Sequence, residues 1–153
     1  MTLADLIQQP HFASPAHEAV LNVVATDSWI SGELSDALAS FDITRAQYNV
    51  LRILRGGHPT PYACSEIASR LLDRMPDVTR LLVRLEAGGY IRRQRAEHDR
   101  RVVEVEITDS GLALLERLDT PIEAAIQRLT AHLSSDELTT LSRLLERLRT
   151  DQR

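Results

Sequence analysis

The chain has 153 residues, of which 43% are hydrophobic and 26% are charged, and its formal net charge is −4 at pH 7. This length and composition predict one globular domain with a buried core. No apolar run approaches the roughly 20 residues of a membrane-spanning helix, and the first ten residues lack the basic start of a secretory signal. A single cysteine excludes an intrachain disulfide and a cysteine-rich metal site. We therefore expect a cytoplasmic protein without a cofactor.

The first half of the chain predicts a long helix followed by a shorter one. Residues 1–14 show little periodicity and are expected to form a loosely held arm. Apolar residues at helical spacing, Trp29 among them, then predict a helix over residues 15–40. Thr44 is a favoured N-cap for a second helix over residues 45–55, which a Gly-Gly pair is expected to stop.

A proline-containing loop separates these from two short helices, expected over residues 65–72 and 76–87. The second short helix opens at Pro76, which is a favoured first helical position. Four apolar residues fall on one stripe, which predicts that this side packs in the core: Val78, Leu81, Leu82 and Leu85. The opposite side is left for a groove of nucleic acid, and it carries Pro76, Thr79, Arg80 and Val83, with Arg84 to one side.

Alternating side chains predict a hairpin of two strands over residues 90–95 and 103–108, with a charged tip at His98-Asp99-Arg100-Arg101. Beyond it, Asp109-Ser110-Gly111 begins a long helical region that Pro121 is expected to kink or break. Ser134 followed three residues later by Glu137 is a capping-box signature for a last helix ending near Thr150.

Charge is segregated along the chain. Residues 1–42 hold six acidic residues and no basic one, residues 43–103 hold twelve arginines and six acidic residues, and residues 104–153 hold six arginines and ten acidic residues. The middle segment is therefore basic by six charges, and this local charge is what a phosphate surface meets. All 18 basic residues are arginine, so every phosphate or guanine contact must come from a guanidinium group.

A pair of short helices followed by an arginine-tipped hairpin is typical of a module that reads duplex DNA. An enzyme is disfavoured because the sequence has no phosphate loop, nucleophile elbow or spaced carboxylate pair, and its five histidines show no metal-ligand spacing. A winged-helix module that binds protein instead of DNA is the alternative. The hairpin arginines and the basic middle segment argue against it.

Several strings in one order resemble the MarR family of bacterial transcription regulators, closely over residues 41–118 and by position only in the flanking helices. These strings are Ile43-Thr44-Arg45-Ala46-Gln47, the recognition-helix run from Val78 to Glu86, Gly89-Tyr90-Ile91-Arg92-Arg93, and Asp99-Arg100-Arg101 followed by Thr108-Asp109-Ser110-Gly111.

The resemblance implies a mainly α-helical fold in which a winged helix-turn-helix with a two-stranded β-wing is embedded in a helical dimerisation domain. The module would span residues 43–108, and residues 15–41 and 110–150 would form the dimer arms of a single domain. A homodimer implies a pseudo-palindromic operator on double-stranded DNA with half-sites roughly 10 bp apart. The resemblance also implies a repressor that a small-molecule effector releases by entering a cleft between the arms and the module.

Arg101 is the strongest candidate for DNA contact, because by resemblance it is the wing arginine that enters a minor groove. Asp99 would either orient it or fix the turn of the wing. The alternative is a solvated hairpin tip with an ion pair of little consequence. Thr79 and Arg80 would reach base edges, where arginine binds guanine with two hydrogen bonds.

Other arginines are candidates for phosphate contact, and half of them are expected to have surface or intramolecular partners instead. They are Arg74, Arg84, Arg92, Arg93, Arg95 and Arg100. Ser65 would present its hydroxyl or its N–H to a phosphate, or simply cap the helix that it begins.

Two positions depart from the family pattern. Ala63 and Cys64 stand where a capping hydroxyl is common, which predicts a weaker or shifted helix cap. Pro76-Asp77 stands where serine or threonine is common, and Asp77 carries a negative charge toward DNA unless it pairs with a cytosine amino group or an arginine. Cys64 is either a redox sensor or, as we favour, a small residue at a helix start.

Trp29 and Tyr48 are aromatic residues on the first two predicted helices. They would line a small-molecule pocket against the DNA-binding module or pack in the core, and core packing is the favoured interpretation.

Overall fold

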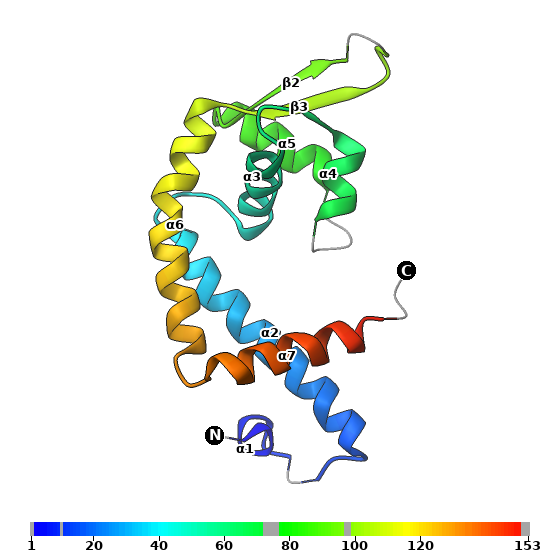
Figure 1. Cartoon of the computed structure of the whole chain (residues 1–153), viewed down its shortest axis with the longest axis vertical. Coiled ribbons are helices and arrows are strands. Elements are labelled where there is room, and N and C mark those ends of the chain that lie inside the picture. Colours follow the sequence, from blue (N-terminus) through cyan, green and yellow to red (C-terminus); the bar gives the residue numbers. More distant parts are fainter. Residues whose placement is uncertain (1, 10, 72–76, 97–98, 151–153) are drawn as a thin grey trace.

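The computed structural model describes residues 2–9, 11–71, 77–96 and 99–150 and shows a helical protein with one small sheet (Figure 1). The helices are α1 (Leu3–Ile7), α2 (Pro15–Ala39), α3 (Arg45–Gly57), α4 (Cys64–Arg70), α5 (Val78–Ala87), α6 (Asp109–Thr130) and α7 (Ser135–Leu148). The strands are β1 (Tyr62–Ala63), β2 (Ile91–Arg95) and β3 (Val103–Ile107). Arg74, Pro76 and His98 lie outside the described residues.

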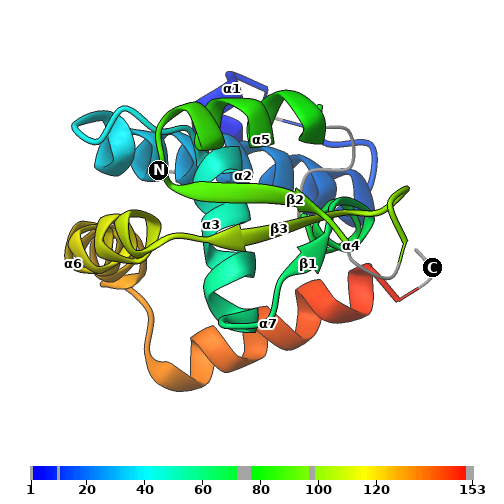
Figure 2. The same cartoon turned by 90° about the horizontal axis from the view of Figure 1, so that it is seen from above.

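The protein has a head and an arm that share the long helix α6. The head holds α3, α4, α5 and the sheet, and the arm holds α1, α2 and α7 (Figure 1). Helix α6 packs against α3 in the head and against α2 in the arm. Seen from above, β2 and β3 lie across the head beside α5, and β3 leads into the N-terminal end of α6 (Figure 2). No described helix is both long and apolar enough to cross a membrane.

The predicted fold class is confirmed, with one correction to the sheet. Strands β2 and β3 form the expected antiparallel hairpin, in which Arg93 lies opposite Val105. A third strand, β1, pairs with the other side of β3 and gives the order β1-β3-β2. The prediction of a two-stranded wing missed β1 because two residues are too few to show alternation, and their partner lies far along the chain.

Local capping signals placed three helix starts correctly. The Thr44 hydroxyl accepts from the Gln47 N–H at 3.2 Å while the Gln47 side chain accepts from the Thr44 N–H at 2.8 Å, which is a complete capping box at α3. Ser134 and Glu137 form the same box at α7. Thr108 caps α6 by accepting from the Gly111 N–H. Each cap satisfies backbone donors that a helix start leaves unpaired.

The expectation of a loose N-terminal segment is wrong, and of the two outcomes expected at Pro121, a kink or a break, the break is absent. The arm expected to be loose contains α1, because Thr2 and Asp5 form a capping box and Leu3 is buried. Pro121 does not break the long helix, since α6 runs unbroken from Asp109 to Thr130. Ile122 next to it is buried in the core, so tertiary packing outweighs the backbone hydrogen bond that a proline removes.

One hydrophobic core joins α3, α4, α5, α6 and the sheet. Its most deeply buried side chains, all below 2% exposed, are Leu38, Leu51, Val50, Ile67, Leu82, Leu85, Val105, Leu115 and Leu118. Every element of the head contributes to this list, so the wing and the helix pair cannot separate without opening the core. Ala68, which follows buried Ile67 in α4, is exposed.

Gly111 marks the point where α6 comes closest to the hairpin. A Cβ atom added there would lie 2.3 Å from the Tyr90 carbonyl oxygen and 2.7 Å from a side-chain carbon of Ile107. The backbone of Tyr90 is held in place because its carbonyl accepts from the Thr108 N–H at 3.1 Å. The absence of a side chain at Gly111 therefore allows α6 to begin directly against the sheet.

We expect Gly111→Ala to destabilise the protein by about 1–3 kcal/mol, because a rigid backbone atom must move to admit the new methyl group. Urea unfolding at 25 °C measures this. Gly56→Ala is the matched control, since nothing lies within 4 Å of a Cβ at Gly56 in α3, and alanine there should be neutral or stabilising by about 0.5–1 kcal/mol. Equal stability of the two variants would contradict the close approach at Gly111.

Candidate nucleic-acid interface

Helix α5 has one buried side and one exposed side. Leu82 and Leu85 are each 1% exposed, and Val78 and Leu81 pack partly against the same core. The side facing solvent carries Thr79, Arg80, Val83 and Arg84. This division confirms the predicted stripe, and it leaves hydroxyl, guanidinium and methyl groups on one accessible surface. Those groups are the ones that contact base edges, phosphates and thymine methyl groups.

Helix α5 begins at Val78 rather than at Pro76, and Asp77 is its N-cap. The Asp77 carboxylate accepts from the Arg80 N–H at 3.0 Å, where it also lies favourably toward the positive end of the helix dipole. The expected partners of this carboxylate were a cytosine amino group or an arginine, and a role as helix cap was missed. The signal for the cap was present, because aspartate directly before a helical apolar pattern is a favoured N-cap.

The tip of the wing is folded back on itself by three hydrogen bonds. The Ala96 N–H donates to the Val102 carbonyl at 3.0 Å, and the Val102 N–H donates to the Asp99 carbonyl at 2.9 Å. The Asp99 carboxylate accepts from the Arg101 N–H at 2.9 Å. Of the two roles predicted for Asp99, the structure shows the one that fixes the turn. The side chain of Arg101 is exposed and pairs with no described acidic residue.

The other predicted phosphate contacts separate into two groups. Arg92 pairs with Glu106 across the hairpin, and Arg93 pairs with Glu86 of α5. Three arginines stay exposed without an ion pair to any described residue: Arg84, Arg95 and Arg100. The Arg95 guanidinium donates to the Arg100 carbonyl at 3.4 Å, which adds support to the tip. The expectation that some of these arginines have intramolecular partners is thus confirmed.

The pair between Glu86 and Arg93 uses both carboxylate oxygens. One accepts from the Arg93 backbone N–H at 3.1 Å, and the other accepts from the guanidinium Nε at 2.8 Å and from Nη2. The guanidinium hydrogen bonds hold the pKa of the Glu86 carboxyl below its usual value, so Glu86 is ionised at neutral pH. This pair fastens the last turn of α5 to the middle of β2.

Helix α4 begins at Cys64 with Ala63 as its N-cap, so the cap comes from neither Ser65 nor a hydroxyl group. The Glu66 carboxylate accepts from the Ala63 N–H at 2.8 Å, and no side chain caps the helix from the N-terminal side. This agrees with the predicted weak cap. Ser65 is exposed. Burial raises the pKa of the Cys64 thiol, which leaves it protonated and weakly nucleophilic at neutral pH.

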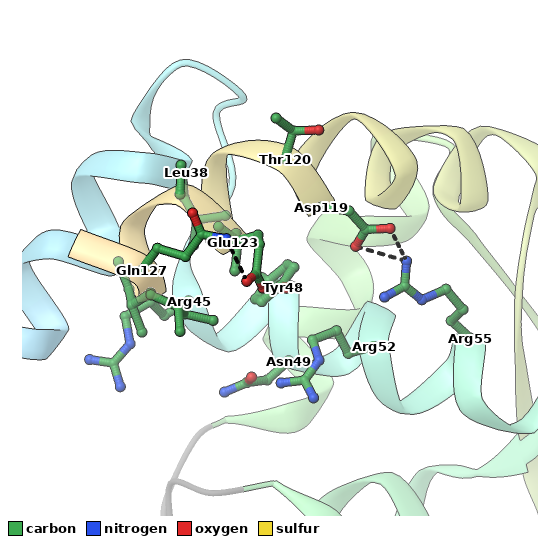
Figure 3. Close-up of a pocket in the computed structure, with 14 residues that line it drawn as sticks. Leu38, Arg45, Tyr48, Asn49, Arg52, Arg55, Asp119, Thr120, Glu123 and Gln127 are labelled. Carbon is green, nitrogen blue, oxygen red and sulfur yellow. Dashed lines mark hydrogen bonds and ion pairs between the residues drawn. The ribbon is translucent and has the colours of Figure 1, made fainter. Parts of the chain in front are cut away.

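A cavity of about 880 Å³ lies between α3 of the head and α6 (Figure 3). Tyr48 and Arg52 line one wall, with the Arg52 guanidinium 5.8 Å from the centre of the Tyr48 ring. Arg55 also lines the cavity and donates to Asp119 at 2.9 and 3.1 Å, which joins α3 to α6 (Figure 3). Burial raises the pKa of the Tyr48 hydroxyl, so it is a neutral hydrogen-bonding group.

The structure does not bring Trp29 to this cavity. Tyr48 lines it, whereas Trp29 lies on α2 with 52% of its surface exposed. Neither role considered for Trp29, pocket wall or core residue, is seen within a single chain. Among the residues that the structure describes, no three His, Cys, Asp or Glu side chains gather as a metal site would require.

Comparison with known proteins gives one consistent family. A model of the MarR family matches residues 41–102. The multiple antibiotic resistance protein MarR of Salmonella typhimurium is 35% identical over 117 residues, which cover 75% of this chain and 79% of that protein. The crystal structure of a MarR transcription factor from Planctomyces limnophilus is 40% identical with a TM-score of 0.70, covering 89% of this chain and 98% of that one.

A further structure contains DNA. The crystal structure of a cysteine-to-serine mutant of MarR from Escherichia coli complexed with operator DNA is 29% identical with a TM-score of 0.75, and the match covers 82% of this chain and 89% of that one. These similarities point to the same family as the exposed face of α5 and the arginine-tipped wing do. The chain therefore belongs to the MarR family of DNA-binding transcription regulators.

Proposed function

We propose that the protein is a homodimeric, sequence-specific regulator whose α5 enters the major groove while the wing tip enters an adjacent minor groove. The observation that carries the proposal is that both surfaces project from one head with their other sides buried. Thr79 and Arg80 are exposed on α5, and Arg101 is exposed on a tip whose turn Asp99 fixes. An inserted helix then reads bases, and a minor-groove arginine senses negative potential.

The arm supports a second copy of the chain as the dimer partner. Among the residues that the structure describes, thirteen large hydrophobic residues are exposed, and only Val83 and Val103 of these lie in the head. The other eleven lie on α1, α2, α7, the last turn of α6 and the turn that follows it: Leu6, Ile7, Val20, Val23, Val24, Trp29, Ile126, Leu133, Leu141, Leu144 and Leu148. Exposed apolar side chains gathered on the arm in this number favour burial against a partner, and a twofold dimer buries the same surface on both copies. This partner also accounts for the exposure of Trp29.

A twofold dimer carries two heads, so the operator is proposed to be pseudo-palindromic with half-sites about one helical turn, roughly 10 bp, apart. The module would span residues 43–108, with residues 15–41 and 110–150 as the dimerisation segments. We propose repression of neighbouring genes as the outcome of binding, because a dimer on a promoter excludes other proteins from it. Exposed Arg84, Arg95 and Arg100, together with Ser65 and Arg74, are the proposed phosphate contacts.

The cavity beside Tyr48 is the proposed site of a small-molecule effector. It lies between α3 and α6, so a ligand there would change how the head sits on the arm. Arg45 and Arg52 line it without an ion pair to any described residue, whereas Arg55 pairs with Asp119 and Glu123 accepts from Gln127. The lining therefore holds three arginines and two carboxylates. This charge favours an anionic ligand. The ligand would release DNA only to the extent that it prefers the non-binding arrangement.

Arg101→Ala should weaken binding to a promoter fragment at least tenfold, since two minor-groove contacts per dimer are lost and each good base contact contributes about 1–3 kcal/mol. Fluorescence anisotropy with a labelled duplex measures the affinity, and light scattering checks that the oligomer is unchanged.

Wild-type affinity must also fall steeply with salt, by a slope of about −0.9 per phosphate neutralised. A flat salt response would favour the protein-binding alternative.

Arg128→Ala is the matched control for Arg101→Ala. It removes the same charge from the arm, where Arg128 lies 3.9 Å from Glu33 and is 63% exposed. Its affinity should equal that of the wild type. If Arg101→Ala and Arg128→Ala bind DNA equally well, the wing has no role in binding.

Asp77→Ser should separate base reading from helix capping. Serine keeps the N-cap hydrogen bond to the Arg80 N–H but removes the negative charge. If Asp77 reads a base, selection of bound duplexes from a random library should show a relaxed preference at one position in each half-site. An unchanged binding motif would mean that Asp77 serves α5 as a cap alone.

Leu144→Glu should convert the dimer to a monomer in light scattering, because it places a charge in the apolar surface of α7. Leu144 is 50% exposed in the single chain. Ser142→Glu is the control, since two residues along a helix point to nearly opposite sides, and it should remain dimeric. A dimeric Leu144→Glu protein would show that this part of α7 lies outside the interface.

A further inference from the structure

The ion pair between Glu86 and Arg93 is the one side-chain ion pair that joins α5 to the wing in the part of the chain that the structure describes. Three hydrogen bonds form it, and both partners are partly buried, with the Arg93 side chain 27% exposed and the Glu86 side chain 36% exposed. Charge-assisted bonds with a forked guanidinium are strong and directional. The pair therefore constrains the orientation of β2 relative to α5 as well as the distance between them.

Because of the position of the pair, a small rotation there displaces the tip of the wing. Arg93 is the central residue of β2, and it faces fully buried Val105 on β3. Arg101 is four residues from Val105, so at about 3.3 Å per strand residue it lies roughly 13 Å beyond this point. A rotation of about 10° at Arg93 would then move the tip by roughly 2 Å, more than the tolerance of a preorganised binding contact.

Core packing of Ile91 and Val105 and the pairing of β3 with β1 hold the base of the wing, and the ion pair adds a directional link from Arg93 to α5. The Tyr90 N–H donates to the Leu85 carbonyl at 3.0 Å, and the Thr108 hydroxyl donates to the Gly89 carbonyl at 2.7 Å. These bonds fix only the turn between α5 and β2. Arg92 and Glu106 lie opposite each other within the hairpin, so their ion pair moves with the wing as a whole.

We propose that Glu86 is a positioning residue for DNA binding: through Arg93 it sets the angle between the wing and α5. With that angle fixed, Arg101 and the exposed side of α5 engage the same half-site. Glu86 also keeps the Arg93 guanidinium from facing DNA, which limits attraction that does not depend on sequence. This inference rests on the proposed role of Arg101.

A double-mutant cycle between Glu86 and Arg101 tests the inference. The probe is a duplex that the wild-type protein selects from a random-sequence library, and anisotropy gives the affinities. Glu86→Gln alone should bind about tenfold more weakly than the wild type, a coupling of the size that interacting residues show. In the Arg101→Ala background the same substitution should change affinity less than twofold, because there is no tip arginine left to position.

Glu106→Gln is the matched control, because it removes an ion pair from the same wing without touching α5. It should bind within twofold of the wild type. Hydroxyl-radical footprints should show that Glu86→Gln loses protection in the minor groove at the wing, while guanine N7 protection in the major groove remains. Should Glu86→Gln unfold at the assay temperature, Arg93→Lys replaces it, because lysine keeps the charge but loses the fork.

The outcomes separate the two proposals. Equal effects of Glu86→Gln in both backgrounds, or no effect in either, would overturn the positioning role while leaving the wing contact intact. If Arg101→Ala itself binds like the wild type, the proposed function of the wing fails, and the positioning role fails with it.

Discussion

The burial of Leu82 and Leu85 is the constraint on which the proposed DNA-binding surface depends. Each is 1% exposed, and truncating such a leucine to alanine typically costs about 2–5 kcal/mol. These two side chains therefore fix the rotation of α5 about its own axis. The opposite side of a short helix must then face solvent, which is why Thr79, Arg80 and Arg84 are exposed. Core packing therefore determines which side chains of α5 are exposed and available to contact DNA.

The arginines of the basic segment have two distinct uses. Those near the base of the wing are paired with carboxylates, as Arg92 is with Glu106 and Arg93 is with Glu86. Those at the tip are exposed, and the backbone of Arg101 is held by Asp99. A chain with a net negative charge can therefore still present exposed guanidinium groups on the wing and on α5. The net charge of the chain does not describe that surface.

Much of this arrangement was predictable because its signals are local. The caps at Thr44 and Ser134, the stripe of α5 and the strands of the wing each lie within a few residues of sequence. Strand β1 was missed because its partner is remote, and Pro121 was misjudged because packing on α2 holds the helix together. Which arginines pair internally depends on contacts between elements, which no local pattern encodes. Trp29 is exposed in the single chain, and the proposed dimer would cover it.

The unbroken course of α6 limits how the molecule can move. Leu115 and Leu118 anchor its first half in the head, while Ala125 is buried further along the same helix. A helix of 22 residues rises about 33 Å at 1.5 Å per residue, and it contains no interruption that would act as a hinge. A small change in the angle between α6 and α3, such as a ligand in the cavity would cause, would therefore be carried along this helix to the arm. In a dimer, such rigidity would restrict the distance between the two heads. The dimer could then contact two half-sites at once only if their spacing falls within a narrow range.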